Sequence, residues 1–187
     1  MDRRTKYTKK VIQDTLIDLL SEKEITKITV SEICEIADIN RATFYRYYLD
    51  VYDLLEKIQN EFSEELKDAY TKENITEYTV SNFAKALLRV FIENQKLVTI
   101  LFSNKTTTNF LDDILDIVYE TCKEKWEQDL PGISQEDIEY ASVFLFNGAL
   151  GVINYWVKNE FDKDINEIAK IIEQLAYFGL KKFIYKH

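Results

Sequence analysis

Residues that interrupt helices are scarce in this sequence of 187 residues, which contains four glycines and one proline. Few tight turns can be built from so few breakers, so long helices are favoured over many short strands. Apolar side chains also recur at helical spacing along almost the whole chain. We therefore expect an all-α protein of about nine helices.

Cysteine and histidine are almost absent as well. Cys34 and Cys122 are too few and too far apart for a disulfide framework or a zinc site, and we expect reduced, buried thiols. The single histidine is His187, and the sequence has no nucleophile–histidine pair, glycine-rich phosphate loop or metal-spaced cluster. The sequence therefore predicts a protein that is not an enzyme and that binds no metal or cofactor.

Long apolar runs are missing too. No run of about 18 apolar residues appears, so we expect no membrane span. The basic start, MDRRTKYTKK, lacks the apolar stretch of a secretion signal. Apolar residues make up 46% of the chain and charged residues 30%, which is typical of a folded soluble protein. We therefore expect a cytoplasmic protein.

Positive charge is low overall but unevenly distributed. The net charge is −9, yet residues 1–48 carry +1 and the remainder carries −10. This asymmetry fits a DNA-facing N-terminal part followed by an acidic C-terminal part. A short basic terminus can equally be a solvated tail, so charge alone does not decide between them.

The first 50 residues predict three short helices, and we take residues 1–50 and 51–187 as two domains. Thr29 and Glu32 form a T-x-x-E capping box, and Asn40 caps the third helix after the turn at residues 38–40. The predicted helices cover residues 8–21, 30–37 and 41–47. Two short helices joined by a three-residue turn and packed on a preceding helix describe a helix-turn-helix, whose second helix enters the DNA major groove.

The predicted recognition helix divides into two faces. Phe44 and Tyr48 lie four residues apart and are expected to pack against the first helix. An ordinary aromatic core cluster is the alternative, but two arginines and three tyrosines on a two-turn helix cannot all be buried.

Each outward residue has a matching DNA group. Arginine can bond bidentately to guanine, and Ala42 can contact a thymine methyl group. Hydroxyl groups suit phosphate oxygens, and the free N–H groups at both helix starts also favour phosphate. The predicted DNA-contacting residues are Thr29, Ser31, Arg41, Ala42, Thr43, Tyr45, Arg46 and Tyr47.

The segment from Ile28 to Leu55, ITVSEICEIADINRATFYRYYLDVYDLL, resembles the N-terminal signature of the tetracycline-repressor (TetR) family, T-V-x-x-I-A-x-x-A-x-V-x-x-x-T-F-Y-x-Y-F. The resemblance implies DNA contacts at positions already assigned, namely Arg41, Ala42, Thr43, Tyr45 and Tyr47. Two departures stand out. Asp38 occupies the turn where the family usually has glycine, and Val51 replaces a lysine that meets a phosphate in the family.

Further helices are predicted at residues 51–69, 79–94, 96–102, 108–130, 134–158 and 164–183. The stretch from Phe146 to Trp156 and the last amphipathic helix resemble C-terminal domains of TetR-like regulators from Firmicutes. This resemblance implies a homodimer formed through residues 136–183 as a four-helix bundle. Gly148, Ala149 and Gly151 would allow close approach of helices there, although packing within one chain is nearly as good an explanation.

The family resemblance also implies a small-molecule pocket in the C-terminal helices, although each aromatic side chain there could simply be core. The predicted ligand-contacting residues are Phe91, Phe102, Phe110, Tyr119 and Phe144. The expected ligand is small, mainly apolar, and neutral or cationic. The sequence thus predicts a dimeric regulator that binds a near-palindromic duplex DNA operator, and the family resemblance implies a repressor released by ligand. The alternative is a coactivator that has lost specific DNA binding, and Val51 and the net acidity keep it open.

Overall fold

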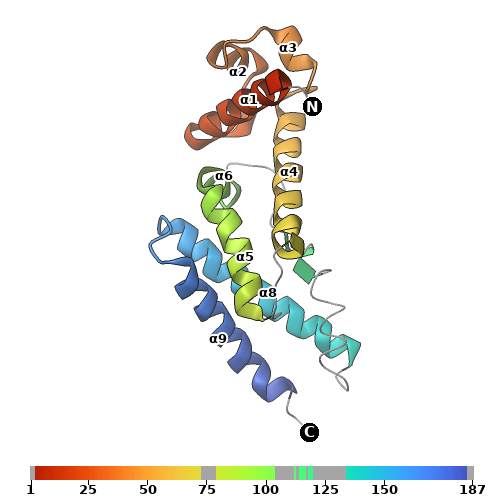
Figure 1. The fold of residues 1–187 in the computed structure, drawn as a ribbon, viewed down its shortest axis with the longest axis vertical. Helices are drawn as coiled ribbons and strands as arrows, with labels where there is room; N and C mark the ends of the chain where they lie inside the picture. Colours follow the sequence, from red (N-terminus) through yellow and green to blue (C-terminus); the bar gives the residue numbers. More distant parts are fainter. Residues whose placement is uncertain are drawn as a thin grey trace. The chain divides into compact units, whose positions relative to one another are not determined.

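The computed structural model describes residues 3–72, 79–103, 112, 114–116, 118, 119 and 134–184, and every regular element within them is helical (Figure 1). The predicted all-α fold is confirmed. The chain divides into two compact units, residues 1–65 with 95–108, and residues 66–94 with 109–187. A functional boundary between residues 50 and 51 stays a prediction.

The first unit contains the three N-terminal helices. Its elements are α1 (Arg3–Glu22), the short 3₁₀ helix η1 (Ile25–Lys27), α2 (Val30–Ile36), α3 (Arg41–Tyr45), the first part of α4 (Val51–Lys72) and α6 (Gln95–Leu101). Helix α1 begins five residues before its predicted start, so the basic N-terminal residues are helical. The apolar faces of α1 and α4 supply much of the core, which includes Ile12, Leu16, Leu20, Leu54, Leu55 and Ile58.

Side-chain caps set the predicted starts of α2 and α3. The Thr29 hydroxyl accepts a hydrogen bond from the Glu32 N–H at 3.3 Å, and the Asn40 carbonyl oxygen accepts one from the Thr43 N–H at 2.8 Å. The Glu32 carboxylate pairs with the Lys23 ammonium at 2.5 Å. The two N-caps are therefore confirmed, and the two short helices begin at the predicted residues. The capping box is only half formed, because the Glu32 carboxylate pairs with Lys23 instead of the Thr29 N–H.

The second unit packs α5 (Val80–Glu93) and α8 (Gln135–Lys158) against α9 (Ile165–Ile184) (Figure 1). Trp156 anchors the core, and its indole N–H donates to the Lys163 carbonyl oxygen at 2.9 Å. Ser134 caps α8 by accepting the Asp137 N–H at 3.1 Å, as predicted. The core of this unit comprises Ala84, Leu88, Trp156, Ile168, Ala169 and Ile172.

One face of α8 and part of α9 leave large apolar side chains exposed. They are Tyr140, Val143, Phe144, Tyr155, Leu175, Tyr177 and Phe178. Among the described residues, α8 is also the helix that is long and apolar enough to cross a membrane by length and composition. One such helix is a weak indication of a span, because helices of soluble proteins pass the same test.

Much of the helix predicted at residues 108–130 lies outside the described residues, as do Phe110 and Cys122. Cys34 is a free, buried thiol, and burial raises its pKa.

Candidate nucleic-acid interface

Helix α3 is fixed to the first unit by its inward aromatic side chains. Phe44 and Tyr48 are both buried, and their ring centroids lie 5.6 Å apart. Helix α2 contacts both α1 and α3. The burial of Phe44 and Tyr48 therefore confirms the predicted anchoring face of the recognition helix.

The outward face presents the residues assigned to DNA. Arg41, Ala42, Tyr45 and Arg46 are exposed. Thr43 and Tyr47 are half-buried. An aromatic core cluster thus accounts for Tyr48 but leaves Tyr45 in solvent. The exposed side chains supply one guanidinium group and one phenol on the five residues of α3, and a second guanidinium group at its C-cap, Arg46.

Two predicted contact residues meet across the turn. The Arg41 guanidinium donates a hydrogen bond to the Ser31 hydroxyl of α2, and both residues are exposed. Arginine carries five N–H donors in a planar fork, so this bond leaves donors for a further acceptor. The bond directs one end of the guanidinium toward α2, which orients the side chain before any ligand binds.

The starts of α2 and α3 already use several of their polar groups within the chain. The Glu32 and Thr43 N–H groups are capped by Thr29 and Asn40. The Thr43 hydroxyl donates to the same Asn40 oxygen at 2.9 Å. A hydroxyl has a single proton to donate. A phosphate contact from Thr43 would therefore have to replace its bond to Asn40.

Burial at the start of α4 explains why residue 51 is a valine and not the lysine of the family pattern. Val51 is buried, with 5% of its surface exposed, so this position belongs to the core of the unit. The Asp50 carboxylate accepts the Asp53 N–H at 2.8 Å, and the Asp53 carboxylate accepts the Leu49 N–H at 2.8 Å. This reciprocal cap was not predicted, although the D-x-x-D spacing that signals it is present in the sequence.

Two lysines outside the predicted set lie beside the recognition helix. The Lys9 ammonium of α1 lies 5.7 Å from the centre of the Tyr47 ring. Lys57 of α4 donates to the Tyr47 carbonyl oxygen at 3.0 Å and to the Asp53 carboxylate at 2.9 Å. The hydrogen bond from Lys57, followed by that from the Leu49 N–H, holds the pKa of Asp53 below its ordinary value.

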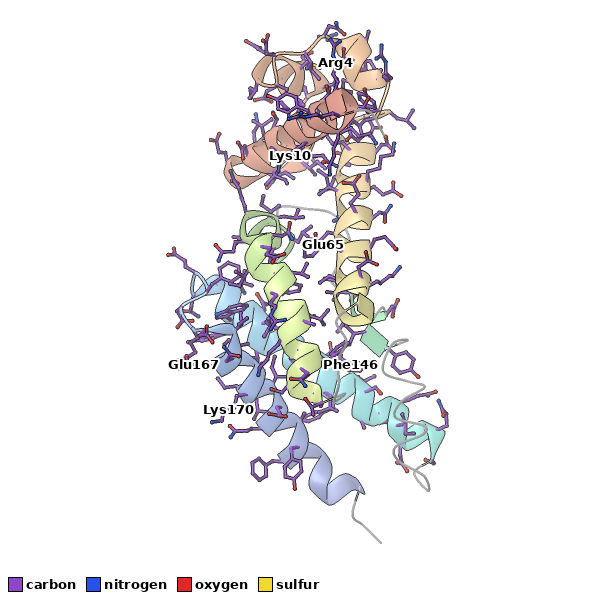
Figure 2. All side chains as sticks on the ribbon, viewed as in Figure 1. Arg4, Lys10, Glu65, Phe146, Glu167 and Lys170 are labelled. Atoms are coloured by element: carbon purple, nitrogen blue, oxygen red, sulfur yellow. The ribbon has the colours of Figure 1, made fainter. Side chains whose placement is uncertain are left out.

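The basic residues near the N-terminus add positive charge to the unit that contains the recognition helix. Helix α1 carries Arg3, Arg4, Lys6, Lys9 and Lys10 in its first turns. Figure 2 labels Arg4 and Lys10 on this helix, in the same unit as α3. A helical arrangement gives these charges fixed positions, which an unstructured basic tail would lack.

The predicted pocket residues do not share one environment. Phe91 and Phe102 are buried, but they belong to different compact units. Tyr119 is half-buried. Phe144 is 67% exposed on α8, which is the position of a surface residue rather than of an interior pocket. A shared ligand site for these residues stays a prediction.

Comparison with known proteins identifies regulators of transcription. Residues 78–177 match the family model TetR_C_8, described as a transcriptional regulator C-terminal region. The HTH-type dhaKLM operon transcriptional activator DhaS of Lactococcus lactis is 34% identical over 94 residues, which are 50% of this chain and 48% of that protein. The HTH-type transcriptional regulator YxbF of Bacillus subtilis is 29% identical over 107 residues, 56% of this chain and 28% of that protein. The matched stretches thus span less than half the length of either curated relative.

The fold has matches among solved structures over nearly the full chain. The structure of a TetR transcriptional regulator from Streptococcus agalactiae 2603V superposes with a TM-score of 0.68 at 21% identity. The match covers 94% of this chain and 96% of that one. At this level of identity the likeness concerns the fold.

Proposed function

The chain belongs to the TetR family of transcriptional regulators, and from that premise we propose that it is a dimeric protein that binds a specific, near-palindromic DNA operator in the cytoplasm. The observation that carries the proposal is that Arg41 on α3 and Arg46 at its C-cap are exposed, while Phe44 and the following Tyr48 are buried and anchor the helix. A helix anchored on one face and basic on the other suits insertion into the major groove.

The groups on this face divide into two proposed roles. Arg41 and Arg46 are proposed to read guanine edges, and Ala42 to contact a thymine methyl group. Thr29, Ser31, Thr43, Tyr45 and Tyr47 are proposed to contact phosphates and fix the register of the protein on DNA. The Thr43 hydroxyl and an N–H group in the first turn of both α2 and α3 already make hydrogen bonds within the chain. The Tyr45 side chain is exposed, so its hydroxyl can bond to a phosphate without breaking one of these bonds.

A homodimer is proposed to form through residues 136–183. The exposed face of α8 carries Tyr140, Phe144, Gly148, Gly151 and Tyr155 at helical spacing. Contiguous apolar surface of this kind marks an interaction site on a soluble protein. A Cβ atom added at Gly148 or Gly151 would meet no described atom within 4 Å, which favours approach of a second subunit over packing within the chain.

The direction of control has two readings. The sequence resemblance implies repression that is relieved by a small apolar ligand. The likeness to DhaS, which is an activator of the dhaKLM operon, favours activation as a second candidate. Transcription from a promoter that contains the selected operator, measured with and without the purified protein, separates the two readings by sign.

Selection of bound duplexes from random DNA tests the core of the proposal. We expect enrichment of a near-palindrome whose half-site centres lie about one helical turn, roughly 34–36 Å, or a multiple of that apart. The buried Val51 and the carboxylates at the start of α4 favour the alternative of a coactivator without specific DNA binding. Recovery of no enriched sequence at low salt would support that alternative.

A further inference from the structure

The segment between α3 and α4 is tied to α4 by the side chain of Lys57. Its ammonium group donates to the Tyr47 carbonyl oxygen at 3.0 Å and to Asp53 Oδ2 at 2.9 Å. The same Asp53 oxygen accepts the Leu49 N–H at 2.8 Å. Two backbone groups in the connection, at Tyr47 and Leu49, are therefore held by one ion pair on the first two turns of α4.

Lys57 also contacts the aromatic anchor of the recognition helix. Its ammonium lies 5.4 Å from the centre of the Tyr48 ring, and Tyr48 is buried against Phe44. A cation over the face of a tyrosine ring is attracted by the ring quadrupole. The side chain thus contacts the last carbonyl before Tyr48, the Tyr48 ring itself and the Asp53 carboxylate in the first turn of α4.

Helix α3 needs such contacts because it is short. It contains five residues, Arg41–Tyr45, and an isolated helix of that length is not stable in water. Its start is fixed by Asn40 and by the Arg41–Ser31 bond. Its end leads into residues 46–50, where the Lys57–Asp53 pair supplies the polar contacts described above.

We propose that Lys57 is a positioning residue for DNA recognition, which holds the end of the recognition helix on α4 through the Tyr47 carbonyl and Asp53. The inference rests on the proposed function and deepens it, because it names a residue that sets affinity for specific DNA without touching a base. Lys57 acts through the backbone of Tyr47, a predicted DNA-contacting residue.

The test compares Lys57→Met with Lys96→Met in the full-length protein. Both changes remove one lysine charge and one ion pair from the first unit, because Lys96 pairs with Asp18. Binding to the selected operator and to a scrambled duplex is measured over a range of salt concentrations. A charge-assisted hydrogen bond of ordinary strength implies about tenfold weaker operator binding for Lys57→Met, with binding to the scrambled duplex unchanged. Lys96→Met is expected to bind both duplexes as the unmodified protein does.

The salt dependence separates positioning from direct contact. A residue that neutralises a phosphate changes the slope of log K against log salt by about 0.9 when it is removed. Lys57→Met is expected to leave that slope unchanged, and the NMR signal of the Leu49 amide is expected to shift in Lys57→Met but not in Lys96→Met. Lys57→Arg retains donors for both acceptors and should recover most of the operator affinity.

Several results would overturn the inference. Equal losses on operator and scrambled DNA with a reduced slope would make Lys57 a phosphate contact. Unchanged operator binding by Lys57→Met would remove its role altogether. If Lys57→Met does not fold, Lys57→Arg decides the matter, since loss of operator affinity in a folded arginine variant contradicts the proposal. If the unmodified protein itself binds no operator, the proposed function fails first and this inference falls with it.

Discussion

At the scale of single residues, Tyr48 buries a hydroxyl group that has no hydrogen-bond partner among the described atoms. The residue is 2% exposed, and burial together with the nearby Glu61 carboxylate raises its pKa well above the usual range. A buried polar group without a partner costs about 1–3 kcal/mol. The TetR pattern has phenylalanine at this position, which avoids that cost.

We therefore expect Tyr48→Phe to raise the free energy of unfolding by about 1 kcal/mol. Chemical denaturation followed by circular dichroism measures the change. Tyr45→Phe is the matched control, because Tyr45 is exposed and its hydroxyl is already solvated. A lower stability for Tyr48→Phe would mean that the hydroxyl has a partner, such as a buried water.

The two departures from the family pattern have clear physical explanations at this scale. Asp38 adopts a left-handed conformation with φ of 50°, which is why the family usually places glycine in this turn. Aspartate tolerates that conformation better than most side chains. Val51 is part of the core, so its replacement of lysine adds apolar packing at the expense of a charge. The sequence identified both positions, but their backbone angle and burial could not be derived from it.

At the scale of elements, the start of α4 depends on a charged cap. Asp53 accepts bonds from Lys57 and from the Leu49 N–H, and these bonds lower the pKa of its carboxyl group from the ordinary value of 3.8. A carboxyl group with a lowered pKa in the folded state stabilises the fold above its unfolded pKa. That contribution disappears as the pH falls through the folded value.

We expect Asp53→Asn to lower the free energy of unfolding by about 1 kcal/mol at pH 7, because the neutral amide weakens the hydrogen bonds that the carboxylate accepts from Lys57 and the Leu49 N–H. The difference from the unmodified protein should shrink as the pH falls below 3.8. Thermal unfolding at pH 7 and at pH 3 measures both effects. Glu56→Gln removes an exposed carboxylate from the same helix and serves as the control. A difference that persists unchanged at pH 3 would assign the effect to something other than the carboxylate charge.

Helix positions were largely predictable because caps and apolar periodicity agree along the chain. The predicted starts at residues 30, 41 and 51 match α2, α3 and α4, and Ser134 caps α8 as expected. The reciprocal cap at Asp50 and Asp53, and the Lys57 contacts, were not predicted. Those contacts depend on how the turn after α3 folds back toward α4, and sequence periodicity carries no information about such a turn.

At the scale of the whole molecule, the proposed homodimer rests on the exposed apolar face of α8 and α9. Leu175 follows the buried Ile168 and Ile172 at helical spacing on α9, yet it is 59% exposed within one chain. Phe144 contacts α9 at Gly179, where an added Cβ atom would lie 3.2 Å from its ring. An apolar stripe that is helical in spacing but exposed in the monomer indicates a partner surface.

We expect Leu175→Asp to yield folded monomers, because a charge at a seam between subunits opposes association while an exposed position tolerates it in the single chain. Sedimentation velocity at micromolar concentration measures the oligomeric state, and circular dichroism checks the fold. Leu49→Asp is the matched control, since Leu49 is an exposed leucine of the first unit. Sedimentation of the unmodified protein as a monomer would contradict the proposed dimer.

The central claim is that α3 reads base sequence, and Arg41 tests it most directly. Arg41→Ala and Tyr45→Phe are compared with the unmodified protein for binding to the selected operator and to all single-base variants of one half-site. We predict that Arg41→Ala abolishes the preference at one position per half-site, which is worth roughly 1–3 kcal/mol, and that Tyr45→Phe weakens binding to every variant evenly. Equal, sequence-independent losses from both substitutions would contradict base recognition by Arg41.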